Sequence, residues 1–244
     1  TQGVGAGIAR AAAAEGATVV VTGRRAEVGE RVAAHLRQDG REALYLQADV
    51  ADVASAQQSV RDTVARFGRV DGLVNAAGLT TRGTLLDTTP DLFDAHVAVN
   101  LRGPFFLMQA AVADMVRRGQ PGSIVNIISM AALGGQPYLA PYVAAKAGLL
   151  GLTKNAAHAH RWDRVRINGI NIGWTETEGE DAVQRGSHDA DDSWREQAAQ
   201  KLPMGKLGQV DDVARLVVLL LSPDSGVVTG SIIDWDQQVP GAHD

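Results

Sequence analysis

Short apolar runs rich in Val, Ile and Leu alternate along this chain with longer amphipathic stretches, and this alternation limits the fold more than any other feature. The predicted strands are Thr18–Thr22, Ala43–Gln47, Gly72–Asn75, Ser123–Ile128, Arg166–Asn171 and Ser231–Asp234. The predicted helices are Val4–Glu15, Ala26–Asp39, Val53–Phe67, Pro90–Arg118 (broken near Gly103-Pro104), Val143–His160 and Val210–Leu221. Nearly continuous apolar strands are typical of burial on both faces. The order predicts an α/β fold with a doubly wound parallel sheet.

One long segment, Thr175–Met204, lacks a clear period. The 244 residues suit one α/β domain, and no linker, repeat or low-complexity tract divides them. We therefore expect a single domain over residues 1–244, with a substrate lid at about 174–204, because long loops in such folds often carry function. A glycine-rich loop such as the one at Gly3 follows a strand, so we also expect an upstream first strand that this numbering lacks.

Charge and composition narrow the class of partner. The chain has 23 basic and 28 acidic residues and a net charge of −5, which disfavours nucleic acid and anionic membranes as partners. It has no apolar run of about 18 residues that would span a bilayer. Cysteine is absent and the six histidines form no metal-ligand spacing, which excludes disulfides, thiol nucleophiles and the common zinc motifs. We expect a cytoplasmic protein without a metal site.

Acidic residues are concentrated in the predicted lid. Between Trp174 and Met204, eight acidic residues face three basic ones, an excess equal to that of the whole chain. If the lid closes over a substrate pocket, this charge should disfavour strongly anionic substrates. Arg82 follows the predicted strand that ends at Asn75. We interpret it as a solvated loop residue, with contact to a substrate anion as the alternative.

Glycines and arginines near the N-terminus suit a dinucleotide. Gly3 and Gly5 open an Ala-rich helix, so the backbone can approach a pyrophosphate and the helix N-terminus offers free N–H groups. Where an acidic residue would bind a ribose 2′-hydroxyl, the chain instead reads Gly23-Arg24-Arg25. Guanidinium groups match a phosphate in charge and geometry. The pattern favours a 2′-phosphate, and two solvated arginines are the alternative interpretation.

A third pattern suits proton transfer. Tyr142 and Lys146 are four residues apart on a predicted helix and so share one face. A protonated lysine beside a phenol favours the phenolate and can bring the tyrosine pKa down from its usual value of about 10. Tyr142 would then be an acid/base for a hydroxyl–carbonyl pair. Ser129, thirteen residues earlier at a strand end, could hydrogen-bond the same oxygen.

Motifs in order over residues 2–230 resemble those of the short-chain dehydrogenase/reductase family, in the branch with subunits of this size. They are Gln2-Gly3-Val4-Gly5 (the end of T-G-x-x-x-G-x-G), Asp49-Val50, Asn75-Ala76-Ala77-Gly78, Asn100, Ser129 with Tyr142 and Lys146, Asn171-Ile172-Gly173 with Thr177, and Val228-Thr229-Gly230. Two places depart from the family's pattern. Ile172 stands where it usually has proline, and Asp236-Gln237-Gln238 stands where many members have D-G-G.

The resemblance implies a Rossmann-type domain that binds a dinucleotide and is catalytic. It implies that Tyr142 is the acid/base and that Lys146 lowers its pKa and holds the nicotinamide ribose. It also implies that Ser129 positions the substrate oxygen, that Asn100 anchors a water in a proton relay, and that the chain forms a homodimer or homotetramer. The cofactor contacts that we infer are Gln2, Gly3, Val4, Gly5, Arg24, Arg25, Asp49, Val50, Asn75, Ala76, Gly78, Tyr142, Lys146, Thr175 and Thr177.

We therefore predict an oxidoreductase that interconverts a small secondary alcohol and a ketone, with NADP(H) as the preferred cofactor and NAD(H) as the possible alternative. Three other functions remain open: a non-catalytic dinucleotide-binding scaffold, an NAD-dependent dehydrogenase of the same family, and a related lyase or epimerase. The complete Asn–Ser–Tyr–Lys set argues against a scaffold, because a scaffold has no physical need for proton transfer.

Overall fold

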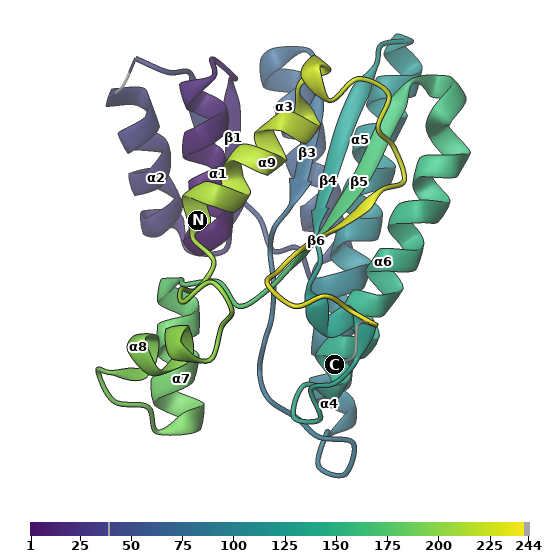
Figure 1. Ribbon diagram of the computed structural model, residues 1–244. Coiled ribbons are helices and arrows are strands. Elements are labelled where there is room, and N and C mark those ends of the chain that lie inside the picture. The colour runs from purple at the N-terminus through teal and green to yellow at the C-terminus, as the bar shows by residue number, and fades with distance from the viewer. Residues whose placement is uncertain (39, 242–244) are drawn as a thin grey trace.

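The computed structural model describes residues 1–38 and 40–241 and shows an α/β architecture with helices packed around parallel strands (Figure 1). The strands in these residues are β1 (Val19–Gly23), β2 (Ala43–Gln47), β3 (Gly72–Asn75), β4 (Gly122–Ile127), β5 (Val165–Ile172) and β6 (Ile232–Trp235). β1 pairs with β2 in one sheet, and a second sheet has the order β3-β4-β5-β6. Every pair is parallel. The predicted fold class is confirmed.

Helices connect these strands. Their bounds are α1 (Gly3–Ala14), α2 (Ala26–Gln38), α3 (Val53–Phe67), α4 (Pro90–Val97), α5 (Gly103–Arg118), α6 (Ala140–His160), α7 (Glu178–His188), α8 (Trp194–Gln200) and α9 (Val210–Leu221). Most bounds lie within one residue of the predicted ones, although α6 begins three residues earlier than expected. Asp39, predicted as the end of a helix, lies outside the described residues.

The predicted break near Gly103-Pro104 is observed as a change of helix type that ends just before Gly103. A π-helical turn, Ala98–Arg102, joins α4 to α5, and its backbone stays right-handed on both sides. The proline stands in the first turn of α5, where a missing N–H is tolerated. A proline there also has no N–H to donate to the carbonyl of Asn100, four residues earlier. The wider π-helical turn therefore lets the chain stay helical at a position where glycine and proline usually end a helix.

The lid segment is helical, which its sequence did not predict. α7 has no buried residue, so it shows no apolar stripe. It is stabilised instead at its first turn, where the Thr177 hydroxyl accepts a hydrogen bond from the N–H of Glu180 at 3.0 Å. Acidic side chains in that turn, Glu178 and Asp181 among them, also suit the positive end of the helix dipole.

Two apolar clusters cover the two faces of the larger sheet. On one face, Val125 and Ile170 pack against α1 and α9, and α9 is the yellow-green helix that runs diagonally at the front of Figure 1. On the other, Ile124 and Ile167 pack against α5 and α6. Neighbouring residues on one strand point to opposite faces, so this alternation buries the strands on both sides. The carboxyl ends of β3, β4 and β5 are thereby held in one rigid frame.

A chain of buried polar groups crosses this frame. The Asn75 amide on β3 donates from Nδ2 to Oδ1 of Asn126 on β4 at 2.8 Å. Asn126 donates from Nδ2 to the Thr153 hydroxyl on α6 at 2.9 Å, and Thr153 donates to the Leu149 carbonyl at 2.7 Å. All are buried. This series of hydrogen bonds fixes α6 against the sheet from within the core.

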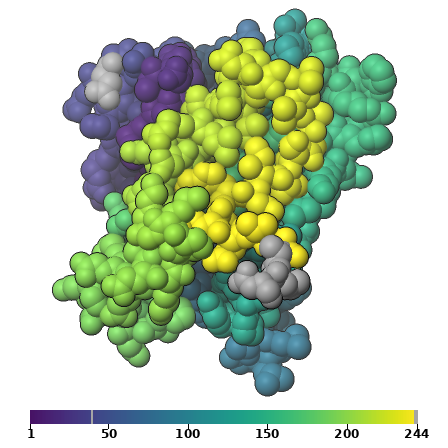
Figure 2. All heavy atoms as spheres, in the orientation of Figure 1, coloured from purple at the N-terminus to yellow at the C-terminus, as the bar shows by residue number. Residues whose placement is uncertain are grey.

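The space-filling view shows the lid as a lobe beside the body of the molecule, with the C-terminal segment running across the visible face (Figure 2). Gln237 attaches the end of the lid to this segment. Its Oε1 accepts from the N–H of Met204 at 2.7 Å, and its Nε2 donates to the carbonyl of Lys206 at 2.6 Å. Within the described residues, no helix combines the length and hydropathy needed to cross a bilayer.

Candidate active site

Tyr142 and Lys146 lie on the first turns of α6, and both are buried, with 8% and 3% of their surface exposed. Pro141 stands in the first turn, where proline suits a helix start. The Lys146 Nζ donates to the carbonyl of Ile127, the last residue of β4, at 2.8 Å. The same nitrogen lies 5.7 Å from the centre of the Tyr142 ring. The predicted pair is therefore fixed at the carboxyl end of β4.

Burial dominates the ionisation of this pair. It raises the pKa of Tyr142 to about 12 and lowers the pKa of Lys146 to about 8. We expected Lys146 to lower the pKa of Tyr142. The structure shows a raised pKa instead, because the cost of burying the phenolate is larger than the effects of the neighbouring groups. Tyr142 therefore carries its proton at neutral pH. A phenolate would need further positive charge in the cleft.

Ser129 completes a contact with the phenol. It follows β4 by two residues and caps a short 3₁₀ turn, with its Oγ accepting from the N–H of Ala131 at 3.1 Å. A hydrogen bond between Ser129 and Tyr142 lowers the tyrosine pKa, although less than burial raises it. The structure thus brings Ser129, Tyr142 and Lys146 together, as their spacing predicted.

Asn100 lies in the π-helical turn and is fully buried. Its Oδ1 accepts from the N–H of Leu79 at 3.0 Å, and its Nδ2 donates to the carbonyl of the same residue at 3.0 Å. This two-way contact fixes the loop after β3. The side chain itself is fully engaged, while Pro104 leaves the Asn100 carbonyl without the usual helical donor.

His96 is a member of this cluster that sequence reasoning missed. Its Nε2 lies 3.0 Å from the carbonyl of Thr81 and its Nδ1 lies 3.2 Å from the Asn100 Nδ2. A carbonyl only accepts, so the ring proton belongs on Nε2, and Nδ1 accepts from the amide. Burial lowers the His96 pKa, which keeps the ring neutral, and the ring meets Tyr142 edge to face at 6.2 Å. The spacing of four residues from Asn100 was the available signal.

The glycine loop meets the lid and the end of β3. A Cβ on Gly3, whose φ is +52°, would lie 3.4 Å from Thr177, and one on Gly5 would lie 3.5 Å from Ala76. No side chain caps the first turn of α1, and no acidic residue lies in it. The first N–H groups of α1 and the positive end of its dipole therefore lie where the glycine loop, Thr177 and Ala76 meet, and such N–H groups are the donors that a pyrophosphate requires.

Arg25 lies beside this junction, because its guanidinium contacts the side-chain oxygen of Gln2. Arg24 is exposed and its carbonyl accepts from Gln47 at 3.1 Å. Arginine side chains at this position suit a phosphate group, because guanidinium matches phosphate in charge and geometry. A Cβ on Gly23 would lie 2.8 Å from the Thr1 side chain, which leaves little room for a larger residue there.

Other predicted cofactor contacts have structural roles as well. The Asp49 carboxylate accepts from the N–H of Ala51 at 2.9 Å and so stabilises its own turn. The carbonyl of Val50 lies so close to Gly103 that no Cβ fits there. Asn75 takes part in the buried polar chain. The Thr175 hydroxyl donates to the carbonyl of Gly173 at 3.0 Å.

The remaining two lie near the described clusters. A Cβ on Gly78 would lie 3.7 Å from the Asn100 Oδ1. Val4 belongs to the first turn of α1 and packs against the apolar cluster under α9. The structure thus groups Gln2 to Gly5, Arg25, Ala76 and Thr177 in one place, whereas Asp49 and Val50 lie on the loop that packs against the start of α5.

Three of the eight acidic residues of the lid are in ion pairs. Arg195 pairs with Glu176 at 2.8 Å and with Asp181 at 2.9 Å, and Arg185 pairs with Asp181 at 3.0 Å and with Asp192 at 2.8 Å. These pairs direct three of the negative charges to partners within the lid. The excess of acidic residues over basic ones in this segment remains.

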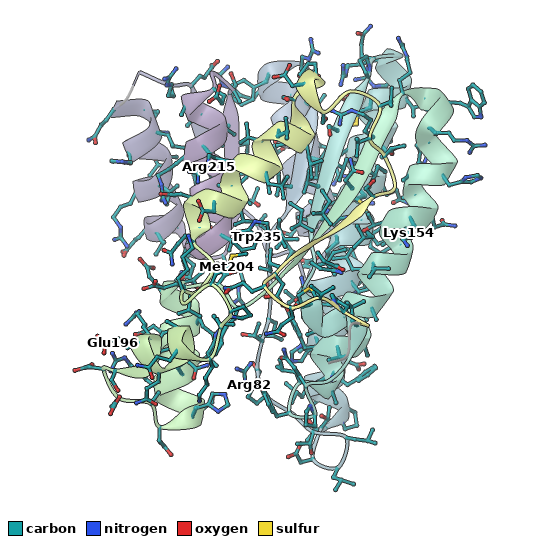
Figure 3. The ribbon with its side chains drawn as sticks, viewed as in Figure 1. Arg82, Lys154, Glu196, Met204, Arg215 and Trp235 are labelled. Carbon is teal, nitrogen blue, oxygen red and sulfur yellow. The ribbon has the colours of Figure 1, made fainter. Side chains whose placement is uncertain are left out.

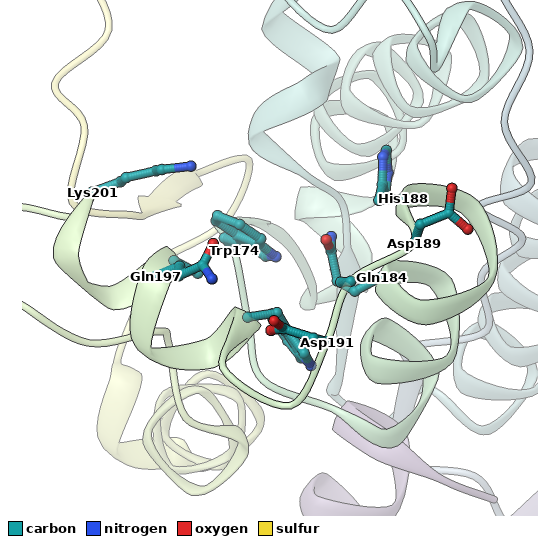
Figure 4. Close-up of a pocket in the computed structure, with 10 residues that line it drawn as sticks. Trp174, Gln184, His188, Asp189, Asp191, Gln197 and Lys201 are labelled. Atoms are coloured by element: carbon teal, nitrogen blue, oxygen red, sulfur yellow. The ribbon is translucent and has the colours of Figure 1, made fainter.

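A cavity of about 310 Å³ lies inside the lid, between α7 and α8 (Figure 4). Its walls are Trp174, Gln184, His188, Asp189, Ala190, Asp191, Trp194, Gln197, Ala198 and Lys201. The two tryptophans stack with their ring centres 6.3 Å apart. None of the four predicted catalytic residues lines it, so this cavity belongs to the interior of the lid.

Known proteins match this sequence over nearly its whole length. The family profile described as enoyl-(acyl carrier protein) reductase matches residues 1–237. An uncharacterized oxidoreductase of Thermotoga maritima is 35% identical over 238 residues, which cover 96% of this chain and 93% of that protein. The 3-oxoacyl-[acyl-carrier-protein] reductase FabG of Staphylococcus aureus is 32% identical over 234 residues, with coverage of 96% and 92%.

A solved structure has the same fold. A variant of actinorhodin polyketide ketoreductase, crystallised with NADPH, superposes with a TM-score of 0.93 at 30% identity and covers 99% of this chain and 94% of its own. The likeness therefore includes the lid and both sheets.

Proposed function

Because the chain belongs to the short-chain dehydrogenase/reductase family, whose members act on CH–OH groups, we propose that it interconverts a secondary alcohol and a ketone with NADP(H). The observation that carries this proposal is the group formed by the buried Tyr142 and Lys146 and the half-buried Ser129 at the carboxyl end of β4, with Asn100 fixed in the neighbouring π-helical turn. Ligands of open α/β sheets bind at this end of the strands.

In the proposed reaction, Tyr142 exchanges a proton between its hydroxyl and the substrate oxygen, as a general acid for reduction and a general base for oxidation. Ser129 hydrogen-bonds the same oxygen and orients the substrate. The nicotinamide cofactor, when bound, supplies or accepts the hydride. Lys146, held by the Ile127 carbonyl, places positive charge beneath the phenol when protonated. Asn100 anchors the water through which the proton returns to solvent.

The direct test is spectroscopic. With NADPH and a panel of ketones, the loss of the absorbance of reduced nicotinamide is measured. With NADP⁺ and the matching secondary alcohols, the gain of the same absorbance is measured. We expect turnover with at least one pair. Tight cofactor binding without turnover across a broad panel would instead support the scaffold interpretation.

Preference for NADP(H) is part of the proposal. It is supported by the contact of Arg25 with Gln2 at the glycine loop and by the NADPH in the related ketoreductase structure. A charge-assisted hydrogen bond contributes roughly 1.5–3 kcal/mol, or about ten- to a hundredfold in affinity. We expect Arg25→Ala to lower kcat/KM with NADPH by this factor and to leave kcat/KM with NADH almost unchanged.

Arg24→Ala is the companion variant, because it removes the adjacent, exposed guanidinium that is the other inferred contact with the 2′-phosphate. Substitution of the arginines is cleaner than Gly23→Asp, because a side chain at Gly23 must displace Thr1. A parent enzyme that prefers NADH, or a ratio that neither arginine variant changes, would show that this loop does not set cofactor choice.

We also propose that the chain acts as one domain with a lid at about 174–204, in the cytoplasm, as a homodimer or homotetramer. Apolar side chains exposed on α5 support self-association, with Phe105 at 44% and Val116 at 43%. Light scattering at micromolar concentration should give two or four times the chain mass of 25.7 kDa. A mass of one chain contradicts the assembly.

A further inference from the structure

Three side chains from separate segments join the lid to the body of the molecule. Arg82 lies in the loop after β3, Tyr138 lies just before α6, and His188 is the last residue of α7. The Arg82 guanidinium lies 5.3 Å from the centre of the Tyr138 ring, which meets the His188 ring edge to face at 5.8 Å. The Nη2 of Arg82 lies 3.3 Å from Nε2 of His188. The interpretation of Arg82 as a solvated loop residue is therefore wrong; it lies between the lid and the helices opposite (Figure 3).

The position of Arg82 is fixed relative to the phenol of Tyr142. The next residue, Gly83, donates its N–H to the carbonyl of Tyr138 at 2.9 Å and accepts from the N–H of Ala140 at 2.9 Å. These bonds attach the loop of Arg82 to the start of α6. A guanidinium held on a rigid backbone loses less conformational entropy when it binds a ligand.

The donors of Arg82 are not all used. Nη1 donates to the carbonyl of Thr80 at 3.1 Å, and Nη2 faces His188. Its Nε is buried and has no acceptor among residues 1–38 and 40–241. Arginine has donors and no acceptor, so His188 must accept in their contact. A buried N–H without an acceptor is costly, and an oxyanion that reaches Nε and Nη2 would satisfy both.

Arg82 and Glu180 are the charged groups that affect the ionisation of the Tyr142 phenol. Arg82 lowers the pKa of Tyr142 and Glu180 raises it, so both charges act on the reacting hydroxyl. Glu180 uses its Oε1 to accept from Trp174 Nε1 at 2.8 Å and from Gln184 Nε2 at 2.8 Å. Its charge is therefore directed partly into the lid, whereas the Nε donor of Arg82 remains unused among the described residues. Glu176, Asp181 and Asp192 of the lid are held in ion pairs with Arg185 and Arg195.

We propose that Arg82, with His188 beside it, binds a carboxylate on the substrate at a distance from the reacting carbonyl, so that the preferred substrates are oxo acids and the corresponding hydroxy acids. This inference rests on the proposed oxidoreductase function. The carboxylate accepts from Nε and Nη2 of Arg82 in two parallel hydrogen bonds. It replaces His188 as the acceptor of Nη2, and His188 donates to it when its proton is on Nε2. Binding the substrate thereby also attaches α7 over the cleft.

The test compares matched substrates that differ only in charge. Straight-chain 2-, 3- and 4-oxo acids and their methyl esters are assayed for kcat/KM with the parent, Arg82→Gln, Arg82→Lys and His188→Gln. We expect the parent to prefer one acid over its ester. Arg82→Gln should lose about ten- to a hundredfold on that acid and stay within a few-fold on the ester. Arg82→Lys should recover part of the loss, because it keeps the charge without the planar fork.

Arg195→Gln is the control, because it removes an arginine that pairs only within the lid. If the contact of Arg82 with His188 only holds the lid in place, Arg82→Gln should lower kcat/KM for the acid and for its ester equally. That result overturns the proposal. A parent that turns over esters at least as well as acids also overturns it while leaving the proposed function intact. Equilibrium binding of the same pairs, followed by tryptophan fluorescence, gives the answer without turnover; equal affinity of parent and Arg82→Gln for the acids would again refute the site.

Discussion

Replacing Tyr142 with Phe is expected to lower kcat by roughly a hundred- to ten-thousandfold, the usual contribution of a positioned acid/base. The change removes only the hydroxyl. The ring keeps its edge-to-face contact with His96 at 6.2 Å and its burial at the start of α6, so the fold and the cofactor site should remain. Turnover is measured with the best ketone of the panel, and cofactor binding is measured by nicotinamide fluorescence.

Tyr45→Phe is a useful comparison, because it removes a hydroxyl that donates to the Gly23 carbonyl at 2.6 Å, in the other sheet. That variant should keep kcat within a few-fold. If Tyr142→Phe retained a substantial part of the parent's activity, the acid/base assignment would fail. A parallel loss of cofactor binding would instead point to a disturbed fold.

Lys146→Met is expected to abolish most turnover and, at the same time, to change how stability depends on pH. In the parent, the lysine pKa is about 8 when folded and 10.5 when unfolded. Between these values the unfolded chain binds more protons, so the free energy of unfolding rises with pH, by roughly 3 kcal/mol from this group. Methionine has a similar shape and no charge, so the variant lacks this rise.

Denaturant unfolding at several pH values from 7.5 to 10.5 measures the effect. The free energy of unfolding of Lys146→Met minus that of the parent should fall by about 3 kcal/mol over this range. At neutral pH the relief of a buried charge is opposed by the Ile127 carbonyl, which loses its donor. A constant difference across the range would show that Lys146 has an ordinary pKa in the folded protein.

Much of the fold followed from local pattern. The bounds of β2, β3, α3 and α9 were predicted as observed, because their apolar spacing and caps agree with their packing. At α3, for example, Asp52 accepts from the N–H of Ala54 at 2.9 Å and Gly68 ends the helix with a φ of +79°. The convergence of Ser129, Tyr142 and Lys146 also followed, since strand ends and helix starts meet at one edge of a parallel sheet.

The remainder depended on contacts between distant residues. Nothing local shows that Arg82 meets His188, 106 residues later, because that contact requires the lid to fold back over the loop after β3. The helices of the lid were missed for a related reason. Its helices are held by contacts across the lid, such as the hydrogen bond from Trp194 to the Asp181 carboxylate at 2.8 Å and the packing of Trp194 against Leu207. The ionisation of Tyr142 depends on burial, which a sequence does not state.

The amide pair in the core bears on how this chain avoids incorrect folds. Asn75 and Asn126 are direct partners in the pairing of β3 with β4. Most other side chains on these strands are interchangeable aliphatic groups, which would tolerate a slip of the strands by two residues. Such a slip would place each amide opposite an aliphatic residue and break the hydrogen bond from Asn75 Nδ2 to Asn126 Oδ1, at about 1–3 kcal/mol for each buried group that loses its partner. The pair therefore favours the observed register of β3 against β4, because it makes misaligned sheets less stable while contributing little to the stability of the correct sheet.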